Sequence, residues 1–451
     1  MALSAATLLT ALAVLCSFFY ILFYISSSKN GKGKGKGKGK AIPGPRPLPI
    51  IGNLHMLGML PHQSLYHLAK KYGPMMSIRL GVVPTVVVSS PQAAEIFLKT
   101  HDAVFASRPR LQVLELIYNG KRGIAFTELG SYWRSVRKIC NMTIFTASKI
   151  ESFASTRKEV LAHFIESLKE AASAKEVVNI RNVKKYQGFN LKELIDELTH
   201  IAGAFNLADV VPFLGAFDLQ NDFVGTLLKE LNQPMNNDGD IMDRNSIKAI
   251  TIDMMVGALD TSAATLEWAL SELLRHPRVL LKLQQELESI VGNKRMVEEN
   301  DLPKLEYLDM VVKEIFRLHP VAPLLVPRES VEDIIIDGCC IPKQSRVLVN
   351  IWAMGRDPNT WSNNAEEFFP ESNIDLHGHD FELIPFGAGR RLCPGKKLGL
   401  IVVKLILAQL VHCFNWELPS GMSPNELDMT ENFGVSLPRK INLCVKPTYR
   451  M

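Results

Sequence analysis

One cysteine of the chain lies in a stretch that is suited to binding a metal. Cys393 follows a glycine-rich run and precedes Gly395, and such glycines let the backbone adopt positive φ and approach a bulky group closely. Pro394 suits the first turn of a helix predicted over residues 395–413. Cys393 would then lie at a helix N-terminus, where free N–H groups and the helix dipole favour thiolate over thiol. With Arg391 two residues earlier, this arrangement suits an iron porphyrin, whose metal binds sulfur and whose propionate binds a guanidinium.

The other cysteines carry no such pattern. The chain has seven cysteines, an odd number, which are widely spaced and include no C-x-x-C pair. A secreted disulfide framework and a zinc ribbon are therefore not expected, and reduced thiols in a cytosolic domain fit better. For Cys140, Cys413 and Cys444 we expect the ordinary role of a small buried apolar side chain.

The frame around Cys393 resembles a family signature. Residues 386–395 fit the pattern F-x-x-G-x-R-x-C-x-G, which resembles the signature of the cytochrome P450 family of haem-thiolate monooxygenases. Residues 43–49 and 352–358 are similar to segments of plant microsomal members in particular. The resemblance extends over nearly the whole chain and implies the cytochrome P450 fold. It also implies Cys393 as the iron ligand of haem b (iron protoporphyrin IX), with Phe386, Arg391 and Gly395 beside the cofactor.

Two further segments resemble haem-binding positions of the family. Trp133 and Arg137 resemble its W-x-x-x-R motif, and at i and i+4 they share one helical face and can reach the same propionate. An indole packed on an arginine stem is the alternative for this pair. Arg328, which ends the run P-L-L-V-P-R, resembles another position on the haem side.

A long helix predicted over residues 245–275 would cross the molecule, because it would be roughly 45 Å long. Its middle resembles the oxygen-binding groove of the family, where Gly257 and a small neighbour leave room over the iron. We expect the hydroxyl of Thr261 to bond back to the carbonyl of residue 257, and Asp260 to relay protons to dioxygen. The alternative is that Asp260 and Thr261 are simply a satisfied polar pair.

Glu314 and Arg317 form the motif E-x-x-R on a predicted helix. In the family this pair is buried and is completed by an arginine from a later segment. That arginine is missing after Glu371 in this chain. We therefore expect the charge of the buried pair to be less compensated than in the family.

Three segments of the family pattern are missing from this chain, near residues 184–189, 220–221 and 371–373. The second gap includes most of a helix that covers the substrate pocket in the family. Two alternatives to a working monooxygenase therefore stay open. One is a truncated relic that is catalytically impaired or does not bind haem, and the other is a haem enzyme with isomerase or dehydratase chemistry.

The composition predicts one large folded unit behind a tether. The 451 residues are 47% hydrophobic and 22% charged, which is ample for an apolar core, and no long linker divides the chain after residue 50. Helical periodicity dominates, which predicts a mainly α fold with small peripheral β-sheets. The expected elements are helices over 148–169, 191–204, 245–275, 277–291 and 302–318, a strand over 82–89, short strands within 334–349 and a hairpin-rich C-terminal tail.

The N-terminus predicts a single transmembrane helix. Residues 2–25 carry no charge and would span about 36 Å as a helix. Six lysines follow within residues 29–40, so the positive-inside rule puts the rest of the chain in the cytosol. A cleaved signal peptide, the alternative, needs a basic start and a shorter apolar core. We expect an anchor in the endoplasmic reticulum membrane over residues 1–25, a basic flexible linker over 26–42 and the haem-thiolate domain over 43–451.

The charge pattern bears on the partners of the chain. The net charge of +5 becomes −1 without the six tether lysines, so the basicity is local. These lysines suit contact with anionic membrane lipid, and the remaining chain offers no footprint for nucleic acid.

The resemblance also implies the reaction. Thiolate donation to the iron favours cleavage of the O–O bond, and one oxygen atom enters a C–H bond. No G-x-G-x-x-G follows a predicted strand, so electrons would come from NADPH through NADPH–cytochrome P450 reductase. Four basic residues beside the haem-side motifs form either a docking face for the reductase or an ordinary solvated surface: Arg134, Lys138, Lys396 and Lys397.

The segments that resemble pocket walls are mostly apolar. This favours a small hydrophobic substrate such as a plant terpenoid or a phenolic, aromatic compound. The expected walls are residues 105–126, 254–262, 321–327 and 433–437.

Overall fold

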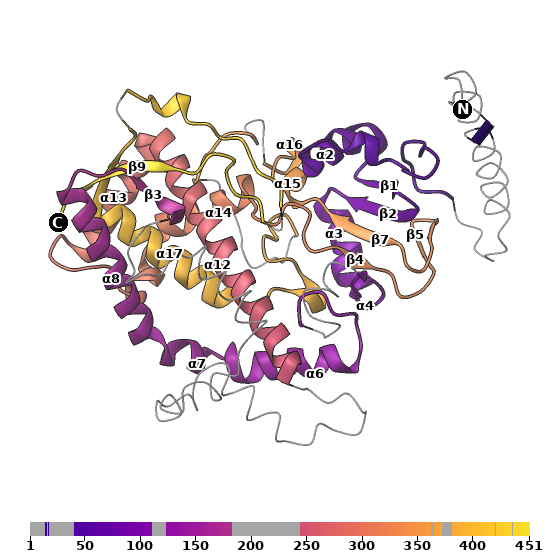
Figure 1. The fold of residues 1–451 in the computed structure, drawn as a ribbon, viewed down its shortest axis with the longest axis horizontal. Helices are drawn as coiled ribbons and strands as arrows, with labels where there is room; N and C mark the ends of the chain where they lie inside the picture. Colours follow the sequence, from indigo (N-terminus) through magenta and orange to yellow (C-terminus); the bar gives the residue numbers. More distant parts are fainter. Residues whose placement is uncertain are drawn as a thin grey trace, which may run out of the picture.

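The computed structural model describes residues 14–15, 17, 40–110, 123–182, 244–361, 365–371, 381–419, 421–434 and 436–451. Helices dominate these residues, and small sheets lie beside them (Figure 1). The prediction of a mainly α fold with small peripheral sheets is therefore confirmed. The helix predicted over 191–204, the gaps near 184–189 and 220–221, and nearly all of the expected anchor and linker lie outside the described residues.

Five helices build the largest core. They are α8 (Ala154–Ser173), α12 (Arg244–Arg275), α13 (Pro277–Val291), α14 (Glu306–Leu318) and α17 (Lys396–Cys413). Helix α13 illustrates why these segments fold as they do, since Pro277 opens it and Gly292 ends it at a φ of 77°. Its residues Val279, Leu283 and Leu287 recur every four positions and are fully or almost fully buried. Each such side chain contributes roughly 1.5–3 kcal/mol of hydrophobic stabilisation.

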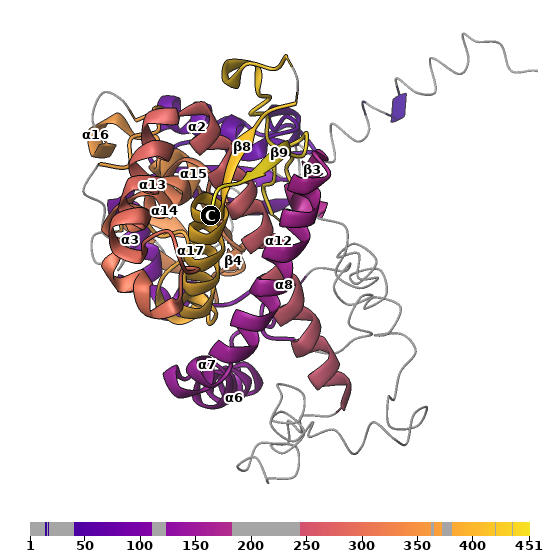
Figure 2. The same cartoon turned by 90° about the vertical axis from the view of Figure 1, so that its left-hand side faces the viewer.

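Helix α12 runs through this core and past its edge toward α6 (Ser131–Ile139), as Figures 1 and 2 show. The C-terminal half of α12 packs against α14 and α17, and Trp268 there is completely buried. Ile247 and Ile250 in its first turns join a separate cluster around Trp133 of α6. One long helix therefore connects the central core with the α6 region.

The four-stranded sheet has the order β1-β2-β7-β4. Its strands are β1 (Met75–Leu80), β2 (Val83–Val88), β7 (Arg346–Val349) and β4 (Arg328–Glu329). The β-branched run of β2 pairs antiparallel with β1 and parallel with β7, with Val86 opposite Val347. The short edge strand β4 places Arg328 beside the sheet, where its side chain is buried.

The C-terminal tail closes the other side of the helical core. Strand β9 (Cys444–Tyr449) pairs with β8 (Phe414–Glu417) and with β3 (Val178–Asn179), so the predicted hairpin-rich tail is confirmed in part. Strands β5 (Ile334–Ile336) and β6 (Cys339–Ile341) form a separate hairpin within the predicted range 334–349. The pairing of β3 with β9 brings the residues just after β3 against α12.

Two predicted helices have different bounds in the structure. The helix expected over 148–169 is divided at Phe153, whose φ of −97° and ψ of 9° leave the helical region, into α7 (Ala147–Ser152) and α8. The helix expected from residue 302 begins only at Glu306, because Pro303 lacks an N–H and lies in a preceding 3-10 turn.

Within the described part of the chain, no helix is both long enough and apolar enough to cross a bilayer.

Candidate active site

The loop that carries Cys393 is closed by a backbone hydrogen bond, because its N–H donates to the carbonyl of Phe386 over 3.0 Å. Gly387 and Gly389 both have a φ of 68°. A Cβ at Gly389 would stand 2.5 Å from Oδ1 of Asp102 and closer still to a carbonyl oxygen, so this position requires glycine. The positive φ predicted for these glycines is therefore confirmed at residues 387 and 389, but it is wrong at Gly395, whose φ is −83°.

The Cys393 thiol lies at the start of α17, as predicted, with Gly395 as the N-cap residue. The backbone N–H groups of Gly395 and Lys396 face the sulfur and lower its pKa, as does the charge of Arg137. Burial has the larger effect, however, and the pKa of the Cys393 thiol is raised above its ordinary value. The N–H groups at the helix N-terminus therefore favour the thiolate as expected, but burial outweighs them. A bound metal cation would supply the missing stabilisation, since a coordinating thiol loses its proton to the metal.

Helix α6 places Trp133 and Arg137 against this loop. The indole N–H of Trp133 donates to the carbonyl of Ile124 over 3.2 Å, and its ring lies 4.0 Å from the guanidinium carbon of Arg391. Nη2 of Arg137 donates to the carbonyl of Leu392 over 2.5 Å. The shared face expected for the two residues is therefore directed at the cysteine loop. The indole stacks on Arg391, whereas the alternative had paired it with Arg137.

Arg391 within the loop and Arg328 beside it are both buried. Arg391 donates to the carbonyls of Ala106 and Thr127, each over 2.6 Å. Arg328 pairs with Asp102 over 2.7 Å and donates to the carbonyl of Ala388 over 2.6 Å. These bonds fix the loop to the chain between residues 102 and 127.

Arg108 is a member of this group that the sequence motifs did not predict. It is buried and donates through Nη1 to the carbonyls of Val326 and Pro327, over 2.5 and 2.8 Å. Burial, together with Arg391 and Arg328, lowers its pKa well below the ordinary value. In the sequence, Arg108 stands between two mostly apolar segments, which could have indicated a buried arginine. None of the recognised motifs includes it.

The arginines around the loop together fit an anionic group. The pKa of Arg391 is lowered to about 9 by burial and by the charges of Arg328 and Arg137. The carboxylate of Asp102 pairs with Arg328 and raises the pKa of Arg391, but burial and like charge outweigh it. Such a concentration of buried positive charge favours a ligand with several negative groups, and the two propionates of haem meet this requirement.

The middle of α12 has the hydrogen bond expected of Thr261, whose hydroxyl donates to the carbonyl of Gly257 over 2.6 Å. This geometric prediction is confirmed. Gly257 and the neighbouring Ala258 are exposed. Asp260 has partners that the sequence did not predict, since its carboxylate binds both Arg181 and Ser436.

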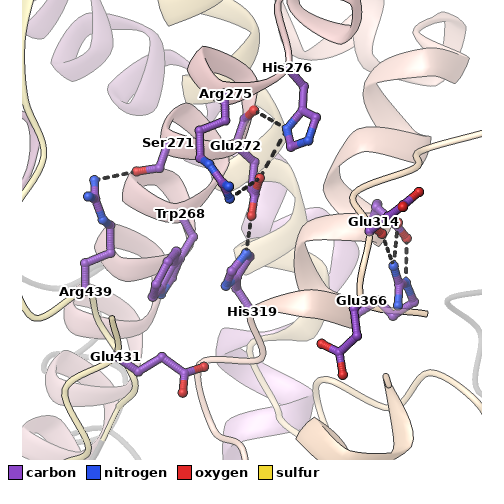
Figure 3. A network of polar contacts seen from close by, with 12 residues as sticks. Trp268, Ser271, Glu272, Arg275, His276, Glu314, His319, Glu366, Glu431 and Arg439 are labelled. Carbon is purple, nitrogen blue, oxygen red and sulfur yellow. Dashed lines mark hydrogen bonds and ion pairs between the residues drawn. The ribbon is translucent and has the colours of Figure 1, made fainter. Parts of the chain in front are cut away.

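Glu314 and Arg317 are buried and fully paired. Nε and Nη2 of Arg317 donate to the two carboxylate oxygens of Glu314 over 2.8 and 2.7 Å. Arg317 also donates to the carbonyls of Gly355, Ala365 and Glu367, and Glu314 accepts from the N–H of Phe369. The expectation of a poorly compensated charge is therefore wrong, because backbone groups of this segment satisfy the pair without a third side chain. Figure 3 shows Glu314 beside a wider network of polar contacts.

That network joins α12 to the segment that follows α14. Nε2 of His319 donates to the carboxylate of Glu272 over 2.7 Å, and the imidazole stacks on Trp268 with ring centroids 4.1 Å apart (Figure 3). The indole N–H of Trp268 donates to the carbonyl of Leu437, whose own N–H donates to the carbonyl of Val321, each over 2.9 Å. Two of the expected pocket walls, at residues 321–327 and 433–437, are therefore held side by side.

A cavity of about 390 Å³ lies against the cysteine loop, but it is not the expected substrate pocket. No residue of α12 lines it. Its lining includes Leu98, Lys99, Phe381, Phe386, Leu392 and Lys396. Phe386 also packs edge-to-face on Phe316 of α14, with centroids 5.3 Å apart.

The four basic residues expected at a docking face are accessible to different extents. Arg134 and Lys138 are exposed on α6, and Lys397 is exposed on α17. Lys396 is partly buried at the start of α17. All four lie on the two helices that contact the cysteine loop.

The fold and this site together define a class of protein. The family model of cytochrome P450 matches residues 42–191 and 215–445, which is most of the chain. The chain therefore belongs to the cytochrome P450 family, and it is a monooxygenase of this haem-binding class.

Several plant proteins are similar to this chain over most of their length. Cytochrome P450 CYP736A12 of Panax ginseng is 50% identical over 461 aligned positions, which cover 90% of this chain and 92% of that protein. Premnaspirodiene oxygenase of Hyoscyamus muticus is 38% identical, and the match covers 89% of this chain and 91% of that protein. Flavonoid 3'-monooxygenase CYP75B137 of Crocosmia x crocosmiiflora is 36% identical with the same coverage. The prediction of a plant-type member is confirmed.

Proposed function

We propose that this enzyme inserts one oxygen atom from O2 into a small hydrophobic plant metabolite, either a terpenoid or a phenolic, aromatic compound. The observation that carries this proposal is the cysteine loop, in which one partly buried thiol lies among buried arginines. Two relatives support the substrate class by their names, since one oxidises premnaspirodiene, a diene by its name, and the other acts on flavonoids.

Each residue around the cysteine loop has its own role in holding the cofactor. Cys393 binds the iron of haem b, and Phe386 and Gly395 shape the loop beside it. Trp133, Arg137, Arg328 and Arg391 hold the propionates, a role supported by their convergence on this loop. Bound haem supplies activation of dioxygen for insertion into a C–H bond. Glu314 and Arg317 support the loop from α14, which agrees with their burial.

Two residues of α12 handle protons. Thr261 donates to the carbonyl of Gly257 within an unbroken stretch of α12, so its hydroxyl oxygen stays available to accept a bond from a small polar molecule. Asp260 exchanges protons with solvent and passes them to the Thr261 hydroxyl. This pairing favours monooxygenation over isomerase or dehydratase chemistry, which needs no proton delivery to dioxygen.

Electrons come from NADPH through NADPH–cytochrome P450 reductase. Arg134, Lys138, Lys396 and Lys397 form its basic docking face, and their position on helices that contact the cysteine loop supports this assignment. Residues 1–25 anchor the enzyme in the endoplasmic reticulum membrane as a single span. Residues 26–42 form a basic linker on the lipid surface, and residues 43–451 form the cytosolic haem domain.

A relic that has lost activity or haem binding is the second candidate. The alignment with the Panax ginseng protein has 461 positions although this chain has 451 residues, so the relative has residues without a counterpart here.

One experiment separates the two candidates. Membranes that contain the expressed full-length chain are reduced with dithionite under carbon monoxide. The enzyme predicts a red-shifted Soret band of the thiolate type, which Cys393→Ser should abolish; persistence of the band in this variant would refute the ligand assignment. Absence of haem absorbance in the wild type would favour the relic. Turnover of a panel of terpenoids and phenolics with NADPH and reductase then identifies the substrate.

A further inference from the structure

Residues 430–434 and 436–440 of the C-terminal tail form a hairpin, whose tip belongs to the expected pocket wall 433–437. Glu431 pairs with Arg439 in an antiparallel bridge at its base. The backbone hydrogen bonds on either side of this pair are 2.8 and 2.9 Å long. The position of the tip therefore depends on what holds this base.

One strand of the hairpin is held by α2 (Pro61–Tyr72). Nε2 of His62 and Nε2 of Gln63 each donate to Oε2 of Glu431 over 2.8 Å. The imidazole of His62 is completely buried, and it also stacks on the ring of Phe433, with centroids 5.7 Å apart and planes at 22°. His62 therefore contacts the hairpin both at its base and at its tip.

Helix α15 (Ile351–Met354) holds the other oxygen of the same carboxylate, because the indole N–H of Trp352 donates to Oε1 of Glu431 over 2.8 Å. Asn350, the N-cap of α15, is completely buried and donates through its side chain to the carbonyl of His62 over 2.8 Å. Burial raises the pKa of Glu431, but the bonds from His62 and Trp352 and nearby charge outweigh it and lower the pKa. Bonds to such a charged acceptor are stronger than bonds between neutral groups. The side chains of His62, Gln63 and Trp352 together form what we call the Glu431 clamp.

The other strand of the hairpin is fixed to α12. Nη1 of Arg439 donates to the hydroxyl of Ser271 over 2.7 Å (Figure 3). Leu437 accepts the indole N–H of Trp268 and donates to the carbonyl of Val321. These bonds tie the tip to α12 and to the other expected wall, whereas the Glu431 clamp ties it to α2 and α15.

We propose that the Glu431 clamp determines which C–H bond of the substrate is oxidised, because it fixes the wall 433–437. His62, Gln63 and Trp352 lie outside every expected wall and are positioning residues. This inference rests on the proposed monooxygenase function and adds the residues that set its regiochemistry. The expected walls are mostly apolar, and apolar contacts have no direction of their own, so the shape of the walls orients the substrate. A wall displaced by roughly 1 Å presents another carbon to the reactive centre.

The test uses the full chain with haem and reductase and the terpene limonene, which has several distinct C–H positions, or whichever panel compound the wild type oxidises. Glu431→Gln removes the charged acceptor, and Trp352→Phe removes the indole N–H but keeps a ring. Each should change the ratio of the oxidised isomers at least about threefold, whereas a mere loss of folded enzyme lowers all products equally. Trp416→Phe is the matched control. Its similarly buried indole donates to the carbonyl of Leu410 over 2.8 Å in β8, and its loss should leave the ratio unchanged.

A second readout needs neither substrate nor turnover. The N–H of Leu437 donates to the carbonyl of Val321, so its hydrogen exchange reports how firmly the tip of the hairpin is held. Exchange should be about tenfold faster in Glu431→Gln and unchanged in Trp416→Phe. If Glu431→Gln does not fold, Gln63→Met carries the test with a smaller change in the same direction, because it removes one partly buried amide and keeps the length of the side chain.

The outcomes separate this inference from the proposed function. If the wild type lacks the thiolate-type band and oxidises no compound of the panel, the proposed function is wrong, and the exchange of Leu437 still decides whether the clamp holds the wall. If the wild type is active, but Glu431→Gln and Trp352→Phe give the same isomer ratio as Trp416→Phe, the inference is wrong. Unchanged exchange of Leu437 in Glu431→Gln would overturn it as well.

Discussion

At the scale of single residues, opposing effects decide the state of Cys393. Two backbone N–H groups and Arg137 favour the thiolate, whereas burial favours the neutral thiol and has the larger effect. The loop is therefore arranged for a sulfur ligand but does not ionise it unaided. The same opposition holds for Arg391, whose burial among other arginines lowers its pKa to about 9. A bound metal would favour the thiolate of Cys393, and a bound anionic ligand would raise the pKa of Arg391 again.

Gly389→Ala should destabilise the protein and reduce its haem content. The new Cβ would meet Asp102 at 2.5 Å with φ at 68°, so we expect a loss of at least about 2 kcal/mol in the free energy of unfolding. Gly58→Ala is the control, because a Cβ there meets its nearest neighbour at 3.7 Å and should change stability by less than about 0.5 kcal/mol. Urea unfolding measures both variants. Equal stabilities of the two variants would show that the loop is not closely packed at residue 389.

Glu314→Gln should be strongly destabilising. It leaves the buried guanidinium of Arg317 without a compensating charge, which costs about 3–5 kcal/mol. Glu95→Gln removes the exposed pair with Lys99 and should cost less than about 1 kcal/mol. Thermal unfolding distinguishes the two variants. A small effect of Glu314→Gln would mean that the backbone carbonyls around Arg317 hold its charge alone.

At the scale of elements, the bounds of helices that local sequence signals encode were predicted well. Contacts between residues far apart in the sequence were not predicted. The helix expected over 277–291 has these bounds because Pro277, Gly292 and a four-residue apolar period all act within one segment. The division at Phe153 has no glycine or proline to announce it. The contact of Arg181 with Asp260 joins residues 79 positions apart through the pairing of β3 with β9, which no local pattern encodes. Arg108 was missed for the same reason, since its partners Val326 and Pro327 are distant in sequence.

The segment 365–371 is attached to α13 by Glu371, and this attachment should depend on pH. Arg278 lies 2.7 Å from Glu371 and Lys282 lies 3.1 Å from it, and pairing with Arg278 lowers the pKa of Glu371 from 4.5 to about 2. The contribution to stability is therefore complete above about pH 4.5 and is lost as the pH falls toward 2.

The measurement compares the wild type with Glu371→Gln by unfolding from pH 6 to pH 3. The difference between the two proteins in the free energy of unfolding should be largest near pH 6 and should shrink as the solution becomes more acidic. Glu332→Gln, at an exposed glutamate, is the control and should show no such trend. A difference that grows on acidification would contradict the pairing.

At the scale of the whole molecule, α12 links the parts that the reaction requires. Its first turns pack beside Trp133, its middle carries Asp260 and Thr261, and its last turns lie in the largest core. The buried ends hold the helix in place, but Val256, next to Gly257, is 42% exposed in the middle. Residues 256–258 form the exposed stretch of α12, and the turns on either side of them are partly buried.

Restoring the residues that this chain lacks should therefore increase haem retention. The corresponding residues of the Panax ginseng protein would be inserted at the three predicted gaps, near residues 184–189, 220–221 and 371–373. Covering the middle of α12 removes apolar surface from water, at about 25 cal/mol per Å², and closes the substrate side of the site. The ratio of haem to polypeptide, measured by the carbon monoxide spectrum, should rise toward saturation. Glycine–serine inserts of the same lengths are the control, since they restore length without apolar residues. A wild-type chain that is already saturated with haem would contradict this expectation and the relic interpretation together.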